Sequence, residues 1–214
     1  KGSTLDISKI MNERKVLLVK LSHGIIGEEN AHLLGSLLVS KFHQSALLRQ
    51  QVAKNSRQPY FLYLDEFQHF VTPSMSSLLT DSRKYALGLT LAHQTLAQLD
   101  DSPVKSAVLG NAHTRIVFRV DYSDAATLAR GFSSFEAEDV QNLTRGEAVV
   151  RMGRAENDFN LRTFPASKVE QEVAQTRSAS VIAHSRETFA TSRAVLEEEF
   201  RTAQVPQEEA PVDV

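Results

Sequence analysis

Short apolar runs alternate with helix-period patterns along the first three quarters of the chain. The runs have the length and composition of buried strands, and they lie at 16–21, 60–64, 89–92 and 115–120. Helical spacing of apolar residues spans 8–12, 28–52, 74–86, 95–99, a segment after Pro103, 124–131 and 135–143. Residues 148–152 and 159–163 are typical of a hairpin. This alternation predicts an α/β fold with a largely parallel sheet and helices on both faces.

The composition becomes more polar after Phe164 and Pro165, which predicts one domain over 1–165 and an appendage over 166–214. The appendage reads as a polar linker, an amphipathic helix near 180–202 and an acidic, disordered tail over 207–214. The apolar residues Ile182, Phe189 and Leu196 of that helix recur at seven-residue spacing, and Phe200 follows four residues later. Such a stripe either docks onto the domain, binds a partner, or belongs to a helix that is disordered in isolation.

Composition excludes several classes of protein. The 214 residues contain 24 Lys and Arg against 26 Asp and Glu, so the net charge of -2 excludes a globally basic nucleic-acid binder, although not a local basic patch. The absence of cysteine excludes disulfides, zinc-thiolate sites and iron–sulfur clusters. The seven histidines are scattered without metal-ligand spacing, and no apolar run is long enough to span a bilayer. No membrane contact is therefore expected of these residues.

The main chemical signal follows the aromatic-rich strand at 60–64, where Asp65 and Glu66 come directly after its last residue. Ligands of open α/β sheets bind beyond the carboxyl ends of the strands. There, the first carboxylate can hold Mg²⁺, and the second can orient or deprotonate an attacking water. This is the pattern of a Walker B element. An ordinary strand that ends in an acidic turn is the alternative.

Further polar residues accompany this pair. Gln94 follows the next strand, where an amide can sense a γ-phosphate or merely cap a turn. Arg83 lies at the end of a helix, where it either complements the helix dipole or reaches a neighbouring subunit's triphosphate as a finger in trans. Arg115 and Arg119 flank the fourth strand, so at least one is expected at the rim, available for phosphate or an interface.

The combined order of these segments resembles the conjugative coupling-protein ATPases of type IV secretion and the related HerA/FtsK-type DNA translocases. The resemblance covers about residues 3–164 and is carried by YFLYLDEF at 60–67, SRKY at 82–85, LAHQ at 91–94, Gly110-Asn111 and IVFRV at 116–120, with support from 16–36. It implies part of a RecA-like P-loop NTPase core. Such a motor works as a hexameric ring, with nucleotide at the subunit interfaces and DNA through the centre.

The resemblance also implies roles for individual residues and partners. ATP and Mg²⁺ are the implied cofactors, with Asp65 serving the metal, Glu66 activating water and Gln94 sensing the γ-phosphate. Arg83 is the implied finger in trans, and Arg115 is its rival. The motor is expected in the cytoplasm, in a full-length protein anchored at the inner membrane, and secretion or relaxase partners are expected to bind through the C-terminal tail.

One departure from the family is large, because the 214 residues contain no G-x-x-x-x-G-K-[ST] phosphate-binding loop. The segment 24–29 has two glycines, but no Lys or Ser/Thr follows them, and its own acids, Glu28 and Glu29, would repel phosphate. With Lys1 as its first residue, the chain is interpreted as a fragment whose loop lies upstream, and it is expected to be inactive alone. Two alternatives stay open: a HerA-like translocase in DNA repair or defence, and a catalytically silent scaffold. Residues 56–58 and 151–158 are candidate DNA-contacting loops or ordinary solvated loops.

Overall fold

The computed structural model describes residues 5–99 and 103–203. Internal contacts divide the chain into one unit of Ile7–Pro165 and another that combines Lys1–Asp6 with Ala166–Val214. No helix within the described residues has both the length and the apolar composition needed to cross a membrane.

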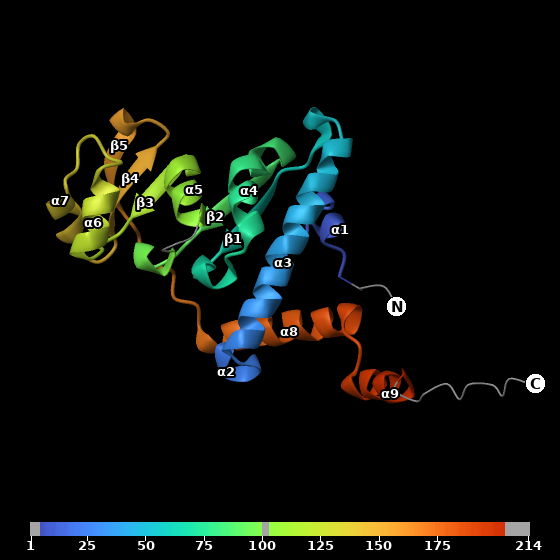
Figure 1. Cartoon of the computed structure of the whole chain (residues 1–214). Helices are drawn as coiled ribbons and strands as arrows, with labels where there is room; N and C mark the ends of the chain where they lie inside the picture. Colours follow the sequence, from blue (N-terminus) through green and yellow to red (C-terminus); the bar gives the residue numbers. More distant parts are fainter. Residues whose placement is uncertain (1–4, 100–102, 204–214) are drawn as a thin grey trace, which may run out of the picture. The chain divides into compact units, whose positions relative to one another are not determined.

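The first unit alternates helices and strands, as the sequence pattern predicts (Figure 1). Its helices are α1 (Ile7–Asn12), α2 (His23–Ile26), α3 (Glu28–Leu48), α4 (Pro73–Asp81), α5 (Pro103–Asn111), α6 (Tyr122–Ala129) and α7 (Ala137–Gln141). Its strands are β1 (Tyr60–Leu64), β2 (Leu87–Leu91), β3 (Thr114–Val117), β4 (Glu147–Met152) and β5 (Asp158–Arg162). Short 3₁₀ turns join them: η1 (Arg49–Gln51), η2 (Lys54–Ser56), η3 (Phe67–Phe70), η4 (Ser82–Tyr85), η5 (Leu96–Leu99) and η6 (Ala155–Asn157).

The strands form two sheets within the described residues, rather than one largely parallel sheet. β1 and β2 are parallel, with Leu64 opposite Leu91. β3 instead pairs antiparallel with β4 of the predicted β4–β5 hairpin, where Val117 faces Val149. Both valines are buried, so this apolar cross-strand pairing explains why β3 joins the hairpin. The prediction of parallel strands therefore holds for β1 and β2 only.

The predicted first strand at 16–21 is not a strand in the structure. Val16 is 84% exposed and Leu18 is 79% exposed. A strand exists only through hydrogen bonds to a neighbour, and no described segment pairs with these residues. The apolar run alone therefore predicted a strand where the structure has an irregular segment.

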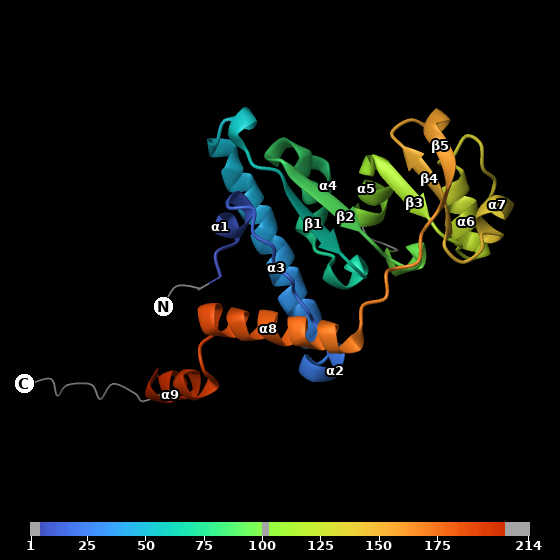
Figure 2. The same ribbon diagram turned by 180° about the vertical axis from the view of Figure 1, so that it is seen from behind.

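One face of the β1–β2 sheet carries a hydrophobic core. Phe67, Met75, Leu99 and Val104 are buried there, and Leu64 and Leu91 pack against them from the two strands. Figure 2 shows the β1–β2 pair in front of α4. Phe61 and Tyr63 alternate onto the other face of β1 and are 63% and 70% exposed. The prediction of helices on both faces is thus not met by the described residues of this unit.

A second core joins β3 and β4 to α6 and α7. Its buried residues are Leu96, Val117, Ala125, Leu128, Phe132, Val140 and Val149. Leu96 belongs to η5, whose last residue Leu99 lies in the first core. The backbone N–H of Leu96 also donates to the buried Asp124 carboxylate at 2.8 Å. The short segment η5 is therefore anchored in both cores, directly after the position of Gln94.

The helix predicted over 74–86 ends at Asp81 and continues as the 3₁₀ turn η4. The chain reverses at Ala86, which has a left-handed backbone with φ 55°. Gly88 lies inside β2, where the ring of Phe61 covers it so closely that a Cβ would lie 2.6 Å from that ring. Because the α-helix ends at Asp81, Arg83 lies on η4, just before β2 begins.

The second unit contains two helices among its described residues, α8 (Gln171–Phe189) and α9 (Arg193–Ala203), where the sequence predicted one helix at 180–202. The break has a local cause, because the Ser192 hydroxyl accepts from the Val195 N–H at 3.4 Å, as an N-cap residue does. Ile182 and Phe189 thus lie on a different helix from Leu196 and Phe200. The acidic tail at 207–214 lies outside the described residues.

We expect Phe67→Ala to destabilise the first unit by about 3–5 kcal/mol, because it empties a fully buried position of the first core. The matched control Phe61→Ala removes a mostly exposed ring and is expected to cost about 1 kcal/mol or less. Urea unfolding followed by circular dichroism measures both changes. Equal losses for the two variants would contradict the assignment of the core to one face of β1.

Candidate active site

The acidic pair follows β1 through a tight turn. Glu66 adopts a left-handed backbone with φ 49°, which is uncommon for a residue other than glycine. The Glu66 N–H donates to Asp65 Oδ1 at 3.1 Å, and the next N–H, that of Phe67, donates to the Ala92 carbonyl at 3.0 Å. The buried Phe67 ring anchors the turn in the first core. Such a conformation costs about 1–3 kcal/mol and persists where its surroundings hold it, as they do here.

Glu66 and Gln94 meet beyond the carboxyl ends of the two parallel strands. Gln94 Nε2 donates to Glu66 Oε1 at 2.6 Å. The parallel register explains the contact, since Leu64 lies opposite Leu91 and both chains leave the sheet at the same edge. The structure thus brings together two of the predicted site residues, which lie 28 positions apart in the sequence.

A second amide, which sequence reasoning missed, completes the surroundings of Glu66. Gln68 Nε2 donates to Glu66 Oε2 at 2.6 Å, so each carboxylate oxygen accepts from one glutamine. The only signal in the sequence was an amide two residues after an acid, which is too common to be informative. Without the left-handed turn at Glu66, nothing predicts that the two side chains meet.

These hydrogen bonds lower the pKa of Glu66 below its ordinary value. The bond from Gln68 is the largest cause and that from Gln94 the next, with smaller contributions from the charges of His69 and His93. Both amides stabilise the ionised form, so Glu66 is a carboxylate at neutral pH. A carboxylate in this state can accept a proton from a water molecule.

Asp65 has the chemistry needed for a shared Mg²⁺ site. Its side chain is exposed at the same edge of the sheet, and the one described hydrogen bond engages Oδ1, leaving Oδ2 as an oxygen donor. No group of three or more acidic or histidine residues among the described ones is arranged to hold a metal ion alone. Protein sites for Mg²⁺ commonly use one or two carboxylates together with phosphate oxygens, so Asp65 fits a site that a nucleotide completes.

Three of the histidines that look scattered in the sequence lie together in the fold. The rings of His32 and His69 stack with centroids 4.6 Å apart, and His23 lies 5.7 Å from each. His69 is in η3, three residues after Glu66, so the stack joins the acidic turn to α2 and α3. These three histidines are thus neighbours in space although they lie apart in the sequence.

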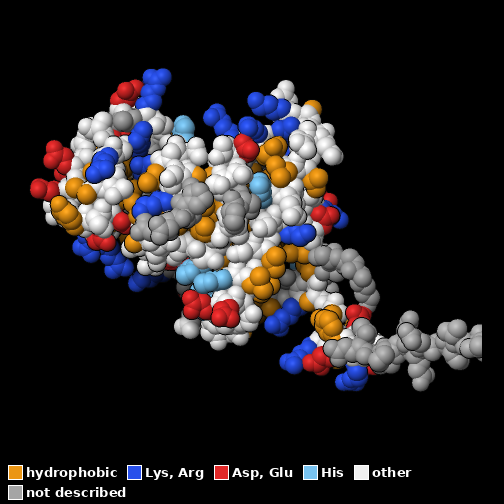
Figure 3. Space-filling model, in the orientation of Figure 1, with side chains coloured by type: hydrophobic (Ala, Val, Ile, Leu, Met, Phe, Trp, Pro, Cys, Tyr) orange, Lys and Arg blue, Asp and Glu red, His pale blue; other side chains and the backbone are white. Residues whose placement is uncertain are grey.

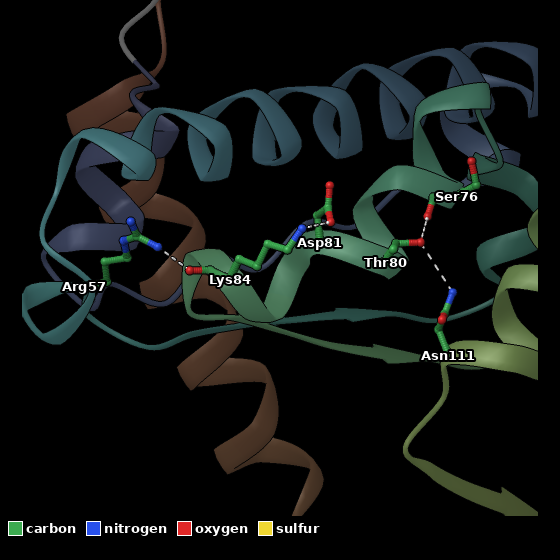
Figure 4. Close-up of polar contacts among 6 residues, drawn as sticks. All are labelled: Arg57, Ser76, Thr80, Asp81, Lys84 and Asn111. Carbon is green, nitrogen blue, oxygen red and sulfur yellow. Dashed lines mark hydrogen bonds and ion pairs between the residues drawn. The ribbon is translucent and has the colours of Figure 1, made fainter.

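Arg83 lies at the other end of the sheet from Glu66. It is exposed on η4 at the amino end of β2, and no hydrogen bond or ion pair involves its guanidinium in the described structure. Its neighbour Lys84 pairs with Asp81 at 2.7 Å, and the Lys84 carbonyl accepts from Arg57 (Figure 4). Arg83 thus has no route to the Glu66 site of its own chain, and its side chain is available to another molecule.

Arg115 has a different environment from Arg83. It is half-buried on β3 opposite Arg151, and its Nη2 donates to the Leu109 carbonyl at 2.7 Å. Arg151 turns to the carbonyl of Gly131, where a Cβ would collide with the Arg115 guanidinium. Burial, and then the charge of Arg151, lower the pKa of Arg115. Because its guanidinium is half-buried and binds a backbone carbonyl, Arg115 is less available than Arg83 to contact another molecule. Arg119 is exposed beyond the end of β3.

We expect Gln94→Leu to raise the pKa of Glu66 toward its ordinary value, because one of the two donors to the carboxylate is lost. Since the folded-state pKa is lowered, Glu66 stabilises the fold above its unfolded-state pKa. That contribution disappears as the pH falls through the folded-state value. Carboxyl-carbon NMR titration measures the pKa, with Gln44→Leu on the exposed face of α3 as the control. Identical titrations of wild type and Gln94→Leu would refute the contact.

Comparison with known proteins relates this geometry to a family. Residues 59–154 match the family described as "TraM recognition site of TraD and TraG". No curated protein matches the sequence significantly.

Several solved structures have a similar fold. The bacterial conjugative coupling protein TrwB is 15% identical with a TM-score of 0.53, covering 67% of this chain and 40% of its own. VirB4 of Thermoanaerobacter pseudethanolicus is 17% identical with a TM-score of 0.51, covering 67% and 39%. The genome packaging NTPase B204 from Sulfolobus turreted icosahedral virus 2 is 17% identical with a TM-score of 0.52, covering 77% and 74%.

At these identities the likeness shows the fold alone: a mixed α/β arrangement with a small parallel sheet, shared with parts of these proteins. This chain spans about 40% of the length of TrwB. The family match and the structural neighbours together confirm the resemblance expected from the sequence, which is to the C-terminal part of a conjugative coupling-protein ATPase.

Proposed function

We propose that this chain carries the residues that hold the metal ion and activate water in an ATP hydrolysis site. The full-length protein would be a ring-forming DNA translocase that serves conjugative transfer through type IV secretion. The contact of Glu66 with Gln94 is the observation that carries the proposal. It joins a proton acceptor to an amide at the carboxyl edge of parallel strands, where α/β proteins bind their ligands. TrwB, whose fold is similar, has been solved with ADP and Mg²⁺, which supports the same ligands here.

Each residue has a distinct role in the proposed reaction. Asp65 holds Mg²⁺, which neutralises charge on the phosphate oxygens when it is bound. Glu66 accepts a proton as the water oxygen bonds to the γ-phosphorus and the bond to the ADP oxygen breaks. Gln94 donates to Glu66 in the described structure, and its amide can donate instead to a γ-phosphate oxygen. That exchange makes Gln94 a sensor, since it links the position of Glu66 to the presence of the γ-phosphate.

The proposal requires contributions from beyond these 214 residues. The sequence contains no G-x-x-x-x-G-K-[ST] loop, so the phosphate cradle has to come from elsewhere in the full-length protein. Arg83 supplies the finger in trans to a neighbouring copy, with Arg115 as the less available alternative. A hexameric ring around DNA, a cytoplasmic motor and anchorage of the full-length protein at the inner membrane belong to the same proposal.

A partner-binding role accompanies the motor role, because the matched family is described as a recognition site for TraM. The match covers residues 59–154, so such a partner would bind the first unit. Binding of secretion or relaxase partners through the C-terminal tail also remains a proposal, and that tail lies outside the described residues.

Glu66→Gln is expected to lower ATP hydrolysis about 10²–10⁴-fold, because the amide keeps the shape of the site but accepts no proton. The measurement uses DNA-stimulated ATPase in the protein that combines these residues with a phosphate-binding loop. The control Glu138→Gln alters an exposed acid of α7 and should leave the rate unchanged. Full activity of Glu66→Gln would favour the silent-scaffold alternative. The 214 residues alone are expected to show no turnover.

Arg83→Ala is expected to abolish hydrolysis in the same protein, whereas Lys84→Ala on the same turn should not. Because the finger acts on a neighbour, mixing Arg83→Ala subunits with Glu66→Gln subunits should restore part of the activity, since some interfaces then combine an intact Glu66 with an intact Arg83. Native mass spectrometry verifies that the variants still assemble. Intact mixed rings without any rescue would count against Arg83 as the finger.

A further inference from the structure

A cavity of about 250 Å³ lies at the amino end of β1, away from the proposed hydrolysis site. Its lining residues come from the end of α1, from the end of α3 with η1, and from η2 and the approach to β1: Asn12, Arg49, Val52, Ser56, Arg57 and Gln58. Glu66 lies at the opposite end of the strand, on the order of 20 Å away at the rise of an extended chain. The cavity is therefore a separate site, and the argument for it does not depend on the hydrolysis proposal.

Arg49 is the buried member of the lining, with only 4% of its surface exposed. Its Nη1 donates to the carbonyls of Tyr85 and Ala86 at 3.1 and 3.3 Å, and its Nη2 donates to Asn12 Oδ1 at 3.2 Å. All three acceptors are neutral oxygens. Hydrogen bonds of this kind orient the guanidinium but leave its positive charge uncompensated.

Two further arginines lie at the same place. Arg57 donates from Nε to the Val52 carbonyl at 2.9 Å and from Nη1 to the Lys84 carbonyl. Arg14 donates from Nε to Gln58 Oε1 at 2.8 Å. In the described part of the chain, none of the three arginines forms an ion pair with a carboxylate, and the lining contains no acidic residue.

The electrostatics of this arrangement favour an anion. Burial lowers the pKa of Arg49, and the positive charge of nearby Arg57 lowers it further. A buried charge without a counter-charge is costly, and a bound anion removes much of that cost. Figure 3 shows Lys and Arg side chains gathered over the upper ends of α3 and α4, the same end of the unit.

We propose that this cavity binds a phosphate group. Two guanidinium groups line the cavity with a third beside it, and their positive charges attract phosphate oxygens although their N–H groups already donate to neutral oxygens, with Arg57 Nη2 donating to the Gln50 carbonyl at 3.5 Å. The Ser56 hydroxyl and the Gln58 amide supply neutral donors of the type that accompany arginine at phosphates. A volume of about 250 Å³ has room for a tetrahedral anion together with water. The phosphate is either a free ion or one group of a nucleic-acid backbone.

The test compares variants of the full 214-residue chain by isothermal titration with two probes, inorganic phosphate and a single-stranded oligonucleotide. Ser56→Glu places a carboxylate at an exposed lining position and should weaken binding at least about tenfold, and Arg14→Gln should weaken it in the same direction. Both positions are exposed, so neither change disturbs a core. Ser56→Ala controls for the loss of the hydroxyl, and Ser77→Glu on α4 controls for the added charge.

Each outcome decides the proposal. A site for the free ion is supported if Ser56→Glu and Arg14→Gln weaken the binding of inorganic phosphate and Ser77→Glu leaves it unchanged. The same pattern with the oligonucleotide alone supports a site for a backbone phosphate. Absence of binding for both probes, or binding that all variants leave unchanged, overturns the proposal.

Discussion

The hydrogen bond from Gln94 to Glu66 is the contact on which the interpretation of this chain depends. It exists because β1 and β2 are parallel neighbours, so that both chains leave the sheet at the same edge. In an antiparallel pair the two residues would leave the sheet at opposite edges. The small parallel sheet thus provides what the proposed chemistry requires, even though the remaining strands of the unit form a separate antiparallel sheet.

The geometry of that contact is maintained from two sides. On the acidic side, Phe67 is buried next to the left-handed Glu66 and holds the turn against the first core. On the amide side, Leu96 and Leu99 fix the segment after Gln94 in two different cores. The exposed polar pair is therefore held by apolar side chains one to five positions away. Rigid placement of a reactive group by packed neighbours is a general requirement of catalytic sites.

Local patterns in the sequence predicted most helices, the parallel pair and the β4–β5 hairpin, because these features depend on periodicity and turn residues over a few positions. The prediction of a strand at 16–21 was wrong. An apolar run indicates that burial is favourable, but it does not indicate whether a partner strand is present. The antiparallel pairing of β3 was also missed, because Arg115 on that strand gives no sign that it faces Arg151. At the site, the residues that follow the strands could be predicted, whereas Gln68 and the cluster of His23, His32 and His69 depend on the turn at Glu66 and on tertiary packing.

The two ends of the β1–β2 sheet differ in charge, and this difference bears on assembly. The carboxyl edge carries Asp65 and Glu66, whereas the amino edge carries Arg83 on η4, with Arg49 and Arg57 donating to the carbonyls of Lys84, Tyr85 and Ala86 behind it. A cyclic ring is built from heterologous contacts, in which two different surfaces of each copy meet. A triphosphate bound at the acidic edge of one copy, with its metal, would still present net negative charge to a neighbour. In the proposed ring, the arginine edge would complement such a charge, because Arg83 is exposed on η4 without a described partner.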